Sequence, residues 1–298
     1  MTAACFIANG TALDEGRIAA FAALVRERQP QATVQVSTSR TEFRRLAQAA
    51  QMRGPCRVVV AGGDGTVCAA ANAFVGTGVE LAWIPMGRAN HLARSFAFPA
   101  EPAAALALAL EGQALPLDVV RVDYRDNGFR TMKAHFVNCA EMGFGAELLR
   151  LQDKVRRWTS RRLAGRLAPA LAGRASRNCD VRLIIDGQDL GLRPATSVVV
   201  GNARYLEAGP PVFPEARLDD GVMEVLRVGA VDPATLMVRG RALQRAPDQQ
   251  ASVRRWNARR VEASCEDPVP IAIDGELLGW LPAAFEVVPA AFRLVLPG

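Results

Sequence analysis

The residues with the clearest chemical signature form a glycine-rich turn, Gly62 to Thr66, with the sequence GGDGT. The apolar run Val58 to Ala61 precedes it and predicts a buried strand, and the alanine-rich stretch Val67 to Phe74 follows it and predicts a helix. A strand, a glycine turn and a helix start direct backbone N–H groups and the positive helix end toward a phosphate. We therefore expect the turn to hold nucleotide phosphates. The alternative is a tight connection that is rich in glycine for steric reasons alone.

Better-known phosphate motifs are excluded by the residues present. No GxxxxGK[ST] run occurs, and the only lysines, Lys133 and Lys154, leave no Walker or protein-kinase lysine. The dinucleotide motif GxGxxG fails because Cys68 stands where its third glycine belongs. With only His91 and His135 in the chain, the sequence also argues against a histidine-based zinc site.

The elements that must position this turn alternate between strand and helix. We predict strands at 3–8, 33–36, 58–61 and 81–84, and helices at 15–28, 40–52, 66–74 and 102–111. Strands interleaved with helices imply a mainly parallel sheet with helices on both faces. Residues 1–117 are therefore expected to form an α/β domain.

From Leu117 onward the pattern changes to short β-branched segments separated by turn residues. Asp126-Asn127-Gly128 and Asp186-Gly187 are the clearest hairpin signals. Further strands are predicted at 197–201, 222–228, 261–264, 269–273 and 292–296. One helical insertion is expected at about 145–172, within a largely β domain over residues 118–288.

The composition limits the classes of protein that fit. The chain has 298 residues, 50% of them hydrophobic, which is enough for two cores and argues against disorder. A formal charge of +6 favours an anionic partner weakly. Six cysteines without a CxxC pair fit a reduced, cytoplasmic protein. No apolar stretch is long enough to span a bilayer, so we expect any membrane contact to be peripheral.

Four later segments accompany the glycine turn in a fixed order: PMGRANHLAR from Pro85 to Arg94, Leu117-Asp118, PEARLDDG from Pro214 to Gly221, and Asp274-Gly275-Glu276. With the turn, they resemble the diacylglycerol kinase catalytic family, specifically the small soluble bacterial lipid kinases related to sphingosine kinases. The resemblance covers nearly the whole chain. It implies an α/β nucleotide-binding domain, to which a last strand at about 289–298 returns, a C-terminal β-sandwich domain with a helical insertion, and an active site between them.

The resemblance also implies roles for individual residues. The nucleotide would be bound by Gly62, Gly63, Asp64, Gly65, Thr66, Gly87, Arg88 and Asn90, with Thr38 as a further contact. Asp64 would help to organise Mg2+, and the cosubstrate would be ATP. Asn9 and Asp118 would lie in the cleft, although Asp118 also fits a strand that crosses between domains and carries one exposed acid.

Asp274 matches the general base of the family. This assignment is chemically sensible, because phosphoryl transfer to an alcohol needs a carboxylate near the acceptor hydroxyl. Glu276 would lie on the same side as Asp274 if the chain is extended there, and would hold Asp274 or a magnesium-bound water. Without the resemblance, Asp274-Gly275 would be interpreted as a hairpin turn.

A structural magnesium ion is implied at the segment that ends in Gly221. The match assigns it to the carboxylate of Asp220 and the carbonyl groups of Arg217 and Val222, with waters completing the shell. The alternative is a polar turn before the strand that begins near Val222.

Some positions depart from the family pattern. The first strand is followed by Ala8 to Ala12 instead of NPxSG, Cys68-Ala69 replace Asn-Glu after the glycine turn, and Arg88 and His91 replace a threonine and a carboxylate. Arg88 is able to compensate through bidentate phosphate contacts. The departures make a catalytically inactive nucleotide-binding protein of the same fold the main alternative, ahead of an NAD kinase, which shares only GGDGT.

A basic, helical segment suggests a membrane partner. Between Arg150 and Arg177 it carries Lys154, Arg156, Arg157, Arg161, Arg162, Arg166 and Arg174 among tryptophan and leucine residues. Such a helix fits docking on an anionic membrane surface, or packing on the β domain with a solvated arginine face. We expect a cytoplasmic kinase, peripheral to the inner face of the membrane, with a lipid substrate and no nucleic-acid partner. A homodimer is compatible with this expectation.

Overall fold

In the computed structural model of the chain, contacts divide the residues into two units, Met1–Val119 with Pro289–Gly298, and Val120–Val288. The structure describes residues 4–52, 56–88, 90–156, 158, 171–172, 178–206, 211–231 and 252–297. Two strands, β5 (Ala114–Arg125) and β15 (Glu276–Val295), each begin in one unit and end in the other.

The first unit alternates strands and helices, as the sequence predicts. Its elements are β1 (Ala4–Asn9), α1 (Glu15–Arg28), β2 (Val34–Ser37), α2 (Arg40–Gln51), β3 (Arg57–Gly62), α3 (Asp64–Phe74), β4 (Glu80–Pro85), α4 (His91–Ser95) and α5 (Pro102–Glu111). The sheet runs in the order β2-β1-β3-β4 and continues with the end of β15, and every neighbouring pair is parallel. The expected α/β class is confirmed here.

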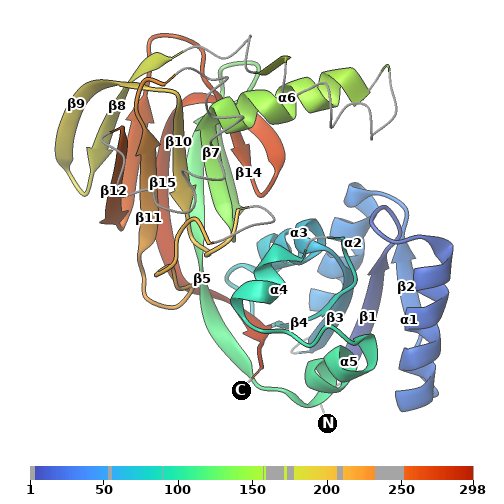
Figure 1. Ribbon diagram of the computed structural model, residues 1–298. Helices are drawn as coiled ribbons and strands as arrows, with labels where there is room; N and C mark the ends of the chain where they lie inside the picture. The colour runs from blue at the N-terminus through green and yellow to red at the C-terminus, as the bar shows by residue number, and fades with distance from the viewer. Residues whose placement is uncertain are drawn as a thin grey trace. The chain divides into compact units, whose positions relative to one another are not determined.

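Helices cover both faces of the parallel sheet (Figure 1). On one face, α1 and α5 bury Phe21 and Leu106 against Val59 of β3. Val58 and Val60 point to the opposite face, since side chains alternate along a strand, and they are fully buried as well. Burial on both faces explains why β3 is continuously apolar, as central parallel strands are.

The second unit is largely β, with one helix among the elements that the structure describes there. Its elements are β6 (Thr131–Phe136), β7 (Cys139–Gly143), α6 (Phe144–Arg156), β8 (Cys179–Ile185), β9 (Gln188–Ala195), β10 (Ser197–Gly201), β11 (Met223–Val228), β12 (Val253–Ala258), β13 (Arg260–Ser264) and β14 (Pro270–Ile273). Antiparallel pairs form one series, β12-β11-β10-β7-β14, and another, β9-β8-β13, and β15 pairs with both series. The arrangement is sandwich-like, as expected.

The core of the second unit is built from the inward-facing residues of both series. Val198 of β10, Val225 of β11 and Val261 of β13 belong to one buried cluster with Phe136 and Phe285. The predicted insertion is helical as far as Arg156, and most of its remainder lies outside the described residues. Within the described ranges, no helix combines the length and the apolar character needed to cross a bilayer.

A buried tryptophan links the core of the first unit to its glycine turn. Trp83 of β4 is 1% exposed, and its Nε1–H donates to the carbonyl of Gly62 at 3.0 Å. We predict that Trp83→Phe lowers the free energy of unfolding by about 1–3 kcal/mol, because it removes this bond and leaves a void. Urea unfolding measures the change. Trp280→Phe is the control, because Trp280 donates to Asn127 at the surface and its loss should cost under about 0.5 kcal/mol. Equal losses would contradict the prediction.

Candidate active site

Glycine is sterically required at the start of the glycine turn, whereas the centre of the turn has free space beside it. A Cβ on Gly62 would lie 2.2 Å from Oγ1 of Thr66, so no other residue fits there. A Cβ on Gly65 would meet nothing within 4 Å. The N-cap of α3 is Gly63, which offers no side-chain hydrogen bond to the first amides of the helix. The positive end of α3 is therefore uncovered by side chains at its cap, which suits a phosphate group.

A second loop packs directly on this turn. A Cβ on Gly87 would lie 2.3 Å from the Cα of Gly63, so the two backbones touch. The backbone of Asn90 is left-handed, with φ 50° and ψ 51°. Its side chain stabilises the second loop, because Nδ2 donates to the carbonyls of Pro85 and Gly87, each at 3.1 Å. Its Oδ1 is buried and has no hydrogen-bond partner among the described residues. The structure thus brings Gly62 to Thr66, Gly87 and Asn90 together.

Asp64 joins the two loops through hydrogen bonds. Its Oδ2 accepts the N–H of His91 at 3.0 Å, and its Oδ1 accepts that of Leu92 at 2.9 Å. The carboxylate therefore satisfies the first amides of α4 and compensates the helix dipole there. This contact is a positioning role that sequence reasoning did not assign to Asp64, and it leaves the expected magnesium role as a prediction.

Asn9 also lies beside the glycine turn, at the end of β1. Its Nδ2 donates to Oγ1 of Thr66 at 2.9 Å, while its Oδ1 accepts from the N–H and the hydroxyl of Thr11. Thr66 is buried, so its hydroxyl orients the asparagine and the start of α3. The only residue of the family's NPxSG turn that keeps its place is thus in contact with the GGDGT segment.

Thr38 and Arg88 are less closely tied to these residues. The Thr38 hydroxyl and N–H both donate to Oε2 of Glu42, at 2.6 and 2.7 Å, and these bonds lower the pKa of Glu42. They secure the start of α2. Arg88 is exposed. The nucleotide contacts expected of both residues remain predictions.

Asp118 is buried, contrary to the alternative of an exposed acid. It is 3% exposed, and its Oδ1 accepts the N–H of Ala290 at 2.8 Å. Ala290 has a positive φ of 49°, and the bond fixes this bend where β15 enters the first unit. Asp118 therefore stabilises a strand crossing, as a buried carboxylate must be hydrogen-bonded.

In the second unit, Asp274 is held by a row of backbone amides. Its carboxylate accepts the N–H groups of Val137, Asn138 and Cys139, at 3.0, 2.9 and 3.1 Å. Asn202 supports this row by donating to the carbonyl of Val137 at 2.9 Å. The side chain of Asp274 is thus firmly oriented at the end of β14.

Sequence reasoning missed Asn138 and Asn202. Both are buried, at 8% and 1% exposure, and each interrupts an apolar strand ending, Phe136 to Ala140 and Val198 to Ala203. Buried amides need partners, so a polar residue at such a position was a usable signal.

The hairpin turn at Asp274 has a structural counterpart in the same unit. Asp186 and Gly187 have φ angles of 47° and 84°, and Asp274 and Gly275 have 46° and 79°. Asp186 likewise accepts backbone N–H groups, from Arg259 and Arg260. The condition of an extended chain at Asp274 is therefore not met, because positive φ angles turn the chain before Glu276. Glu276 begins β15 opposite Ile273.

The proposed metal segment forms a surface loop. Oδ1 of Asp220 accepts the N–H of Val222 at 3.0 Å, and Gly221 between them has φ 69°. The Arg217 guanidinium pairs with Asp219, which raises the pKa of Arg217. One exposed carboxylate at a tight turn fits Mg2+, which retains most of its waters in proteins. The described residues contain no cluster of three or more His, Cys, Asp or Glu side chains able to hold a metal.

Comparison with known proteins accounts for both units. Residues 3–122 match the model of the diacylglycerol kinase catalytic domain, and residues 138–296 match that of the YegS C-terminal NAD kinase beta sandwich-like domain. The chain is 28% identical to a probable lipid kinase YegS-like of Xanthomonas campestris pv. campestris, over 98% of this chain and 95% of that protein. It is 29% identical to a diacylglycerol kinase of Mycobacterium tuberculosis, over 86% of this chain and 82% of that protein.

Solved structures share the fold. A diacylglycerol kinase from Bacillus anthracis str. Sterne superposes with a TM-score of 0.71 at 19% identity, covering 99% of this chain and 96% of that one. Yeast NADH kinase complexed with NADH superposes with a TM-score of 0.60 at 12% identity, covering 100% and 84%. The two domain matches together span most of the chain in the expected order. The chain therefore belongs to the diacylglycerol kinase family of lipid kinases.

Proposed function

We propose that this kinase uses ATP and Mg2+ to phosphorylate a hydroxyl group of a diacylglycerol-like or related lipid. The proposal rests on two features of the start of α3: no side chain caps it, and the space beside Gly65 is open. Together they leave room for a chain of phosphate groups. The lipid class is supported by the relatives, which are named lipid kinases and diacylglycerol kinases.

Different residues of the candidate site would bind the phosphates and remove the proton. The amides at the start of α3 would hold the ATP phosphates, and the loop of Gly87 and Asn90 would close on them. Asp274 would take the proton of the acceptor hydroxyl, in an orientation fixed by its amide row. Asp64 would help to organise a magnesium ion, which would supply neutralisation of charge on the phosphates. Asp220 and the carbonyls of Arg217 and Val222 would hold a structural magnesium ion.

A peripheral membrane location is part of the proposal. Trp158, directly after α6, is 89% exposed, as an interfacial anchor would be. Arg150 of the same basic segment pairs with Glu147, so it contributes little net charge. Most of the arginines of this segment lie outside the described residues.

Gly65 tests the phosphate site without disturbing the fold. We predict that Gly65→Ala weakens ATP binding at least about tenfold, because a methyl group would occupy the space in front of the α3 amides. Gly78→Ala is the matched control, since a Cβ there also meets nothing within 4 Å. Isothermal titration calorimetry with ATP and Mg2+ gives both affinities. Equal affinities in the two variants would remove the phosphate site from this turn.

Asp274 is tested against its structural counterpart Asp186. Asn at either position turns an NH2 group toward backbone donors, so both variants should lose about 1–3 kcal/mol of stability. We predict that Asp274→Asn alone lowers the transfer of labelled phosphate from ATP to dioctanoylglycerol, by about 100-fold or more.

The results separate three outcomes. Transfer that survives in Asp274→Asn would refute the assigned base. Equal losses in Asp274→Asn and Asp186→Asn would show that the effect is structural. Tight ATP binding by the wild type, without transfer to any lipid alcohol, would favour the inactive nucleotide-binding alternative, to which the departures at Cys68, Arg88 and His91 point.

The metal assignment predicts a selective dependence on magnesium concentration. Asp220→Ala should raise the Mg2+ concentration needed for half-maximal activity about tenfold, because it removes the only side-chain ligand proposed for that ion. Asp219→Ala is the control, since that carboxylate pairs with Arg217. Titrating Mg2+ at saturating ATP measures the effect, and identical shifts in both variants would point to general electrostatics.

A further inference from the structure

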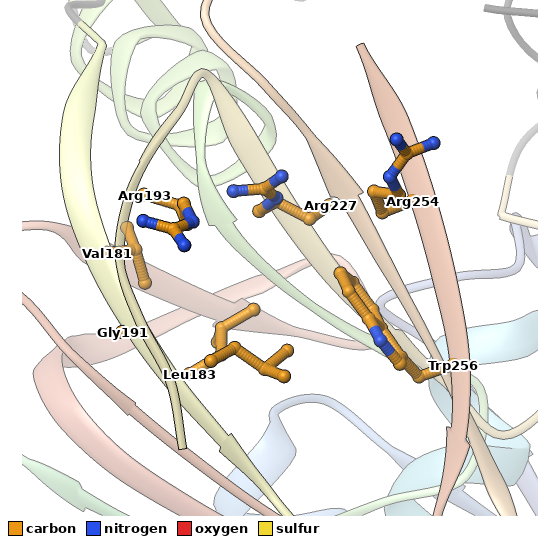
Figure 2. A pocket seen from close by; sticks show the side chains of 8 residues that line it. Val181, Leu183, Gly191, Arg193, Arg227, Arg254 and Trp256 are labelled. Carbon is orange, nitrogen blue, oxygen red and sulfur yellow. The ribbon is translucent and has the colours of Figure 1, made fainter. Parts of the chain in front are cut away.

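The second unit contains a pocket with an apolar base and an arginine rim, and none of the residues assigned above lines it. It has a volume of about 220 Å3 and is lined by Val181, Leu183, Leu190, Gly191, Arg193, Arg227, Arg254 and Trp256. The lining comes from β8 and β9 on one side and from β11 and β12 on the other. Figure 2 shows the three guanidinium groups at one end, with Leu183 and Trp256 toward the other. The described lining contains no carboxylate.

The arrangement of the arginines is unfavourable in the absence of an anion. Arg227 and Arg254 are directly opposite each other on antiparallel strands, where like charges destabilise the pairing. Nε of Arg227 is buried, with no hydrogen-bond partner in the part of the chain that the structure describes. Burial, and then the charges of Arg193 and Arg254, lower the pKa of Arg227.

Several arginines elsewhere in this unit are paired with acids. Arg255, on the opposite face of the same strand pair, lies 3.7 Å from Oε2 of Glu224. Arg182 pairs with Asp189, and Arg260 pairs with Glu262. The pocket arginines have no such partner among the described residues, so their convergence needs a different explanation.

The chemistry of the pocket specifies its ligand. Guanidinium groups make bidentate bonds to phosphate oxygens, and three of them match a group with more than one negative charge. Val181 and Leu183 are buried parts of the core, and Trp256 packs against it, so the base favours carbon atoms. The volume lies below the roughly 300–1,000 Å3 of pockets that enclose whole drug-sized ligands. It suits a head group and the first carbons of a chain.

We propose that this arginine pocket binds the phosphate group and adjoining carbons of a phosphate-bearing amphiphile, at a site separate from the one that contains Asp274. The phosphate can be presented by a dissolved amphiphile or by a lipid in a bilayer, because only the head group enters. The site does not depend on phosphoryl transfer, so its test omits ATP and magnesium.

Calorimetry with dihexanoyl phosphatidic acid, below its critical micelle concentration, tests the site directly. Arg227→Gln should weaken binding at least about tenfold, because it removes a charged hydrogen-bond donor. Arg259→Gln, which removes an exposed charge outside the pocket, should bind as the wild type does. Inorganic phosphate and adenosine monophosphate should each bind at least about tenfold more weakly than the amphiphile. Vesicles of phosphatidylcholine with phosphatidic acid form the bilayer arm, in which the same dependence on Arg227 is expected.

Thermal unfolding distinguishes a binding residue from a structural one. Without ligand, Arg227→Gln should melt at or above the wild-type temperature, because it relieves the repulsion with Arg254. The amphiphile should raise the melting temperature of the wild type but not that of Arg227→Gln. Equal binding by wild type and Arg227→Gln would overturn the proposal, as would a ligand-free Arg227→Gln variant that melts lower. Binding of inorganic phosphate or adenosine monophosphate as tight as that of the amphiphile would overturn it too.

Discussion

The bond pair that Asp64 makes with the N–H groups of His91 and Leu92 organises the first unit around its candidate phosphate site. One carboxylate at the start of α3 satisfies the start of α4. It thereby holds the loop of Gly87 against Gly63, where the two backbones touch. With this charge occupied, the start of α3 keeps an uncapped positive end.

The same physical rule operates in the second unit, where carboxylates again satisfy rows of backbone amides. Asp274 accepts three such donors, and Asp186 accepts two at an equivalent turn. Because the contact recurs at a second turn of the same conformation, it serves the fold. Catalysis by Asp274 would then be an addition to a structural role, and the paired variants are able to separate the two.

The arginines at the rim of the arginine pocket differ from other arginines of the second unit in their charged neighbours. Arg182, Arg255 and Arg260 of the sandwich each have an acid within reach, whereas Arg227 faces Arg254 across a strand pair. In natural proteins, such local destabilisation is concentrated at functional sites. A head-group site there would give the second unit a contact with phosphorylated amphiphiles that is independent of the glycine turn.

The sequence by itself determined the element types and the parallel sheet, and it predicted a phosphate-binding turn, because periodicity and glycine spacing are local properties. It also predicted the order of the domains through motifs that the domain matches confirm. Only the tertiary structure decided which carboxylates accept hydrogen bonds from distant backbone amides, and how the chain turns at the others. Asp118 is buried against Ala290, Asp64 binds the amides of α4, and Glu276 follows a left-handed turn. The roles of Asn138 and Asn202 and the existence of the arginine pocket were likewise visible only in the tertiary structure. These features depend on partners distant in the sequence, and a linear pattern does not contain the register that brings such partners together.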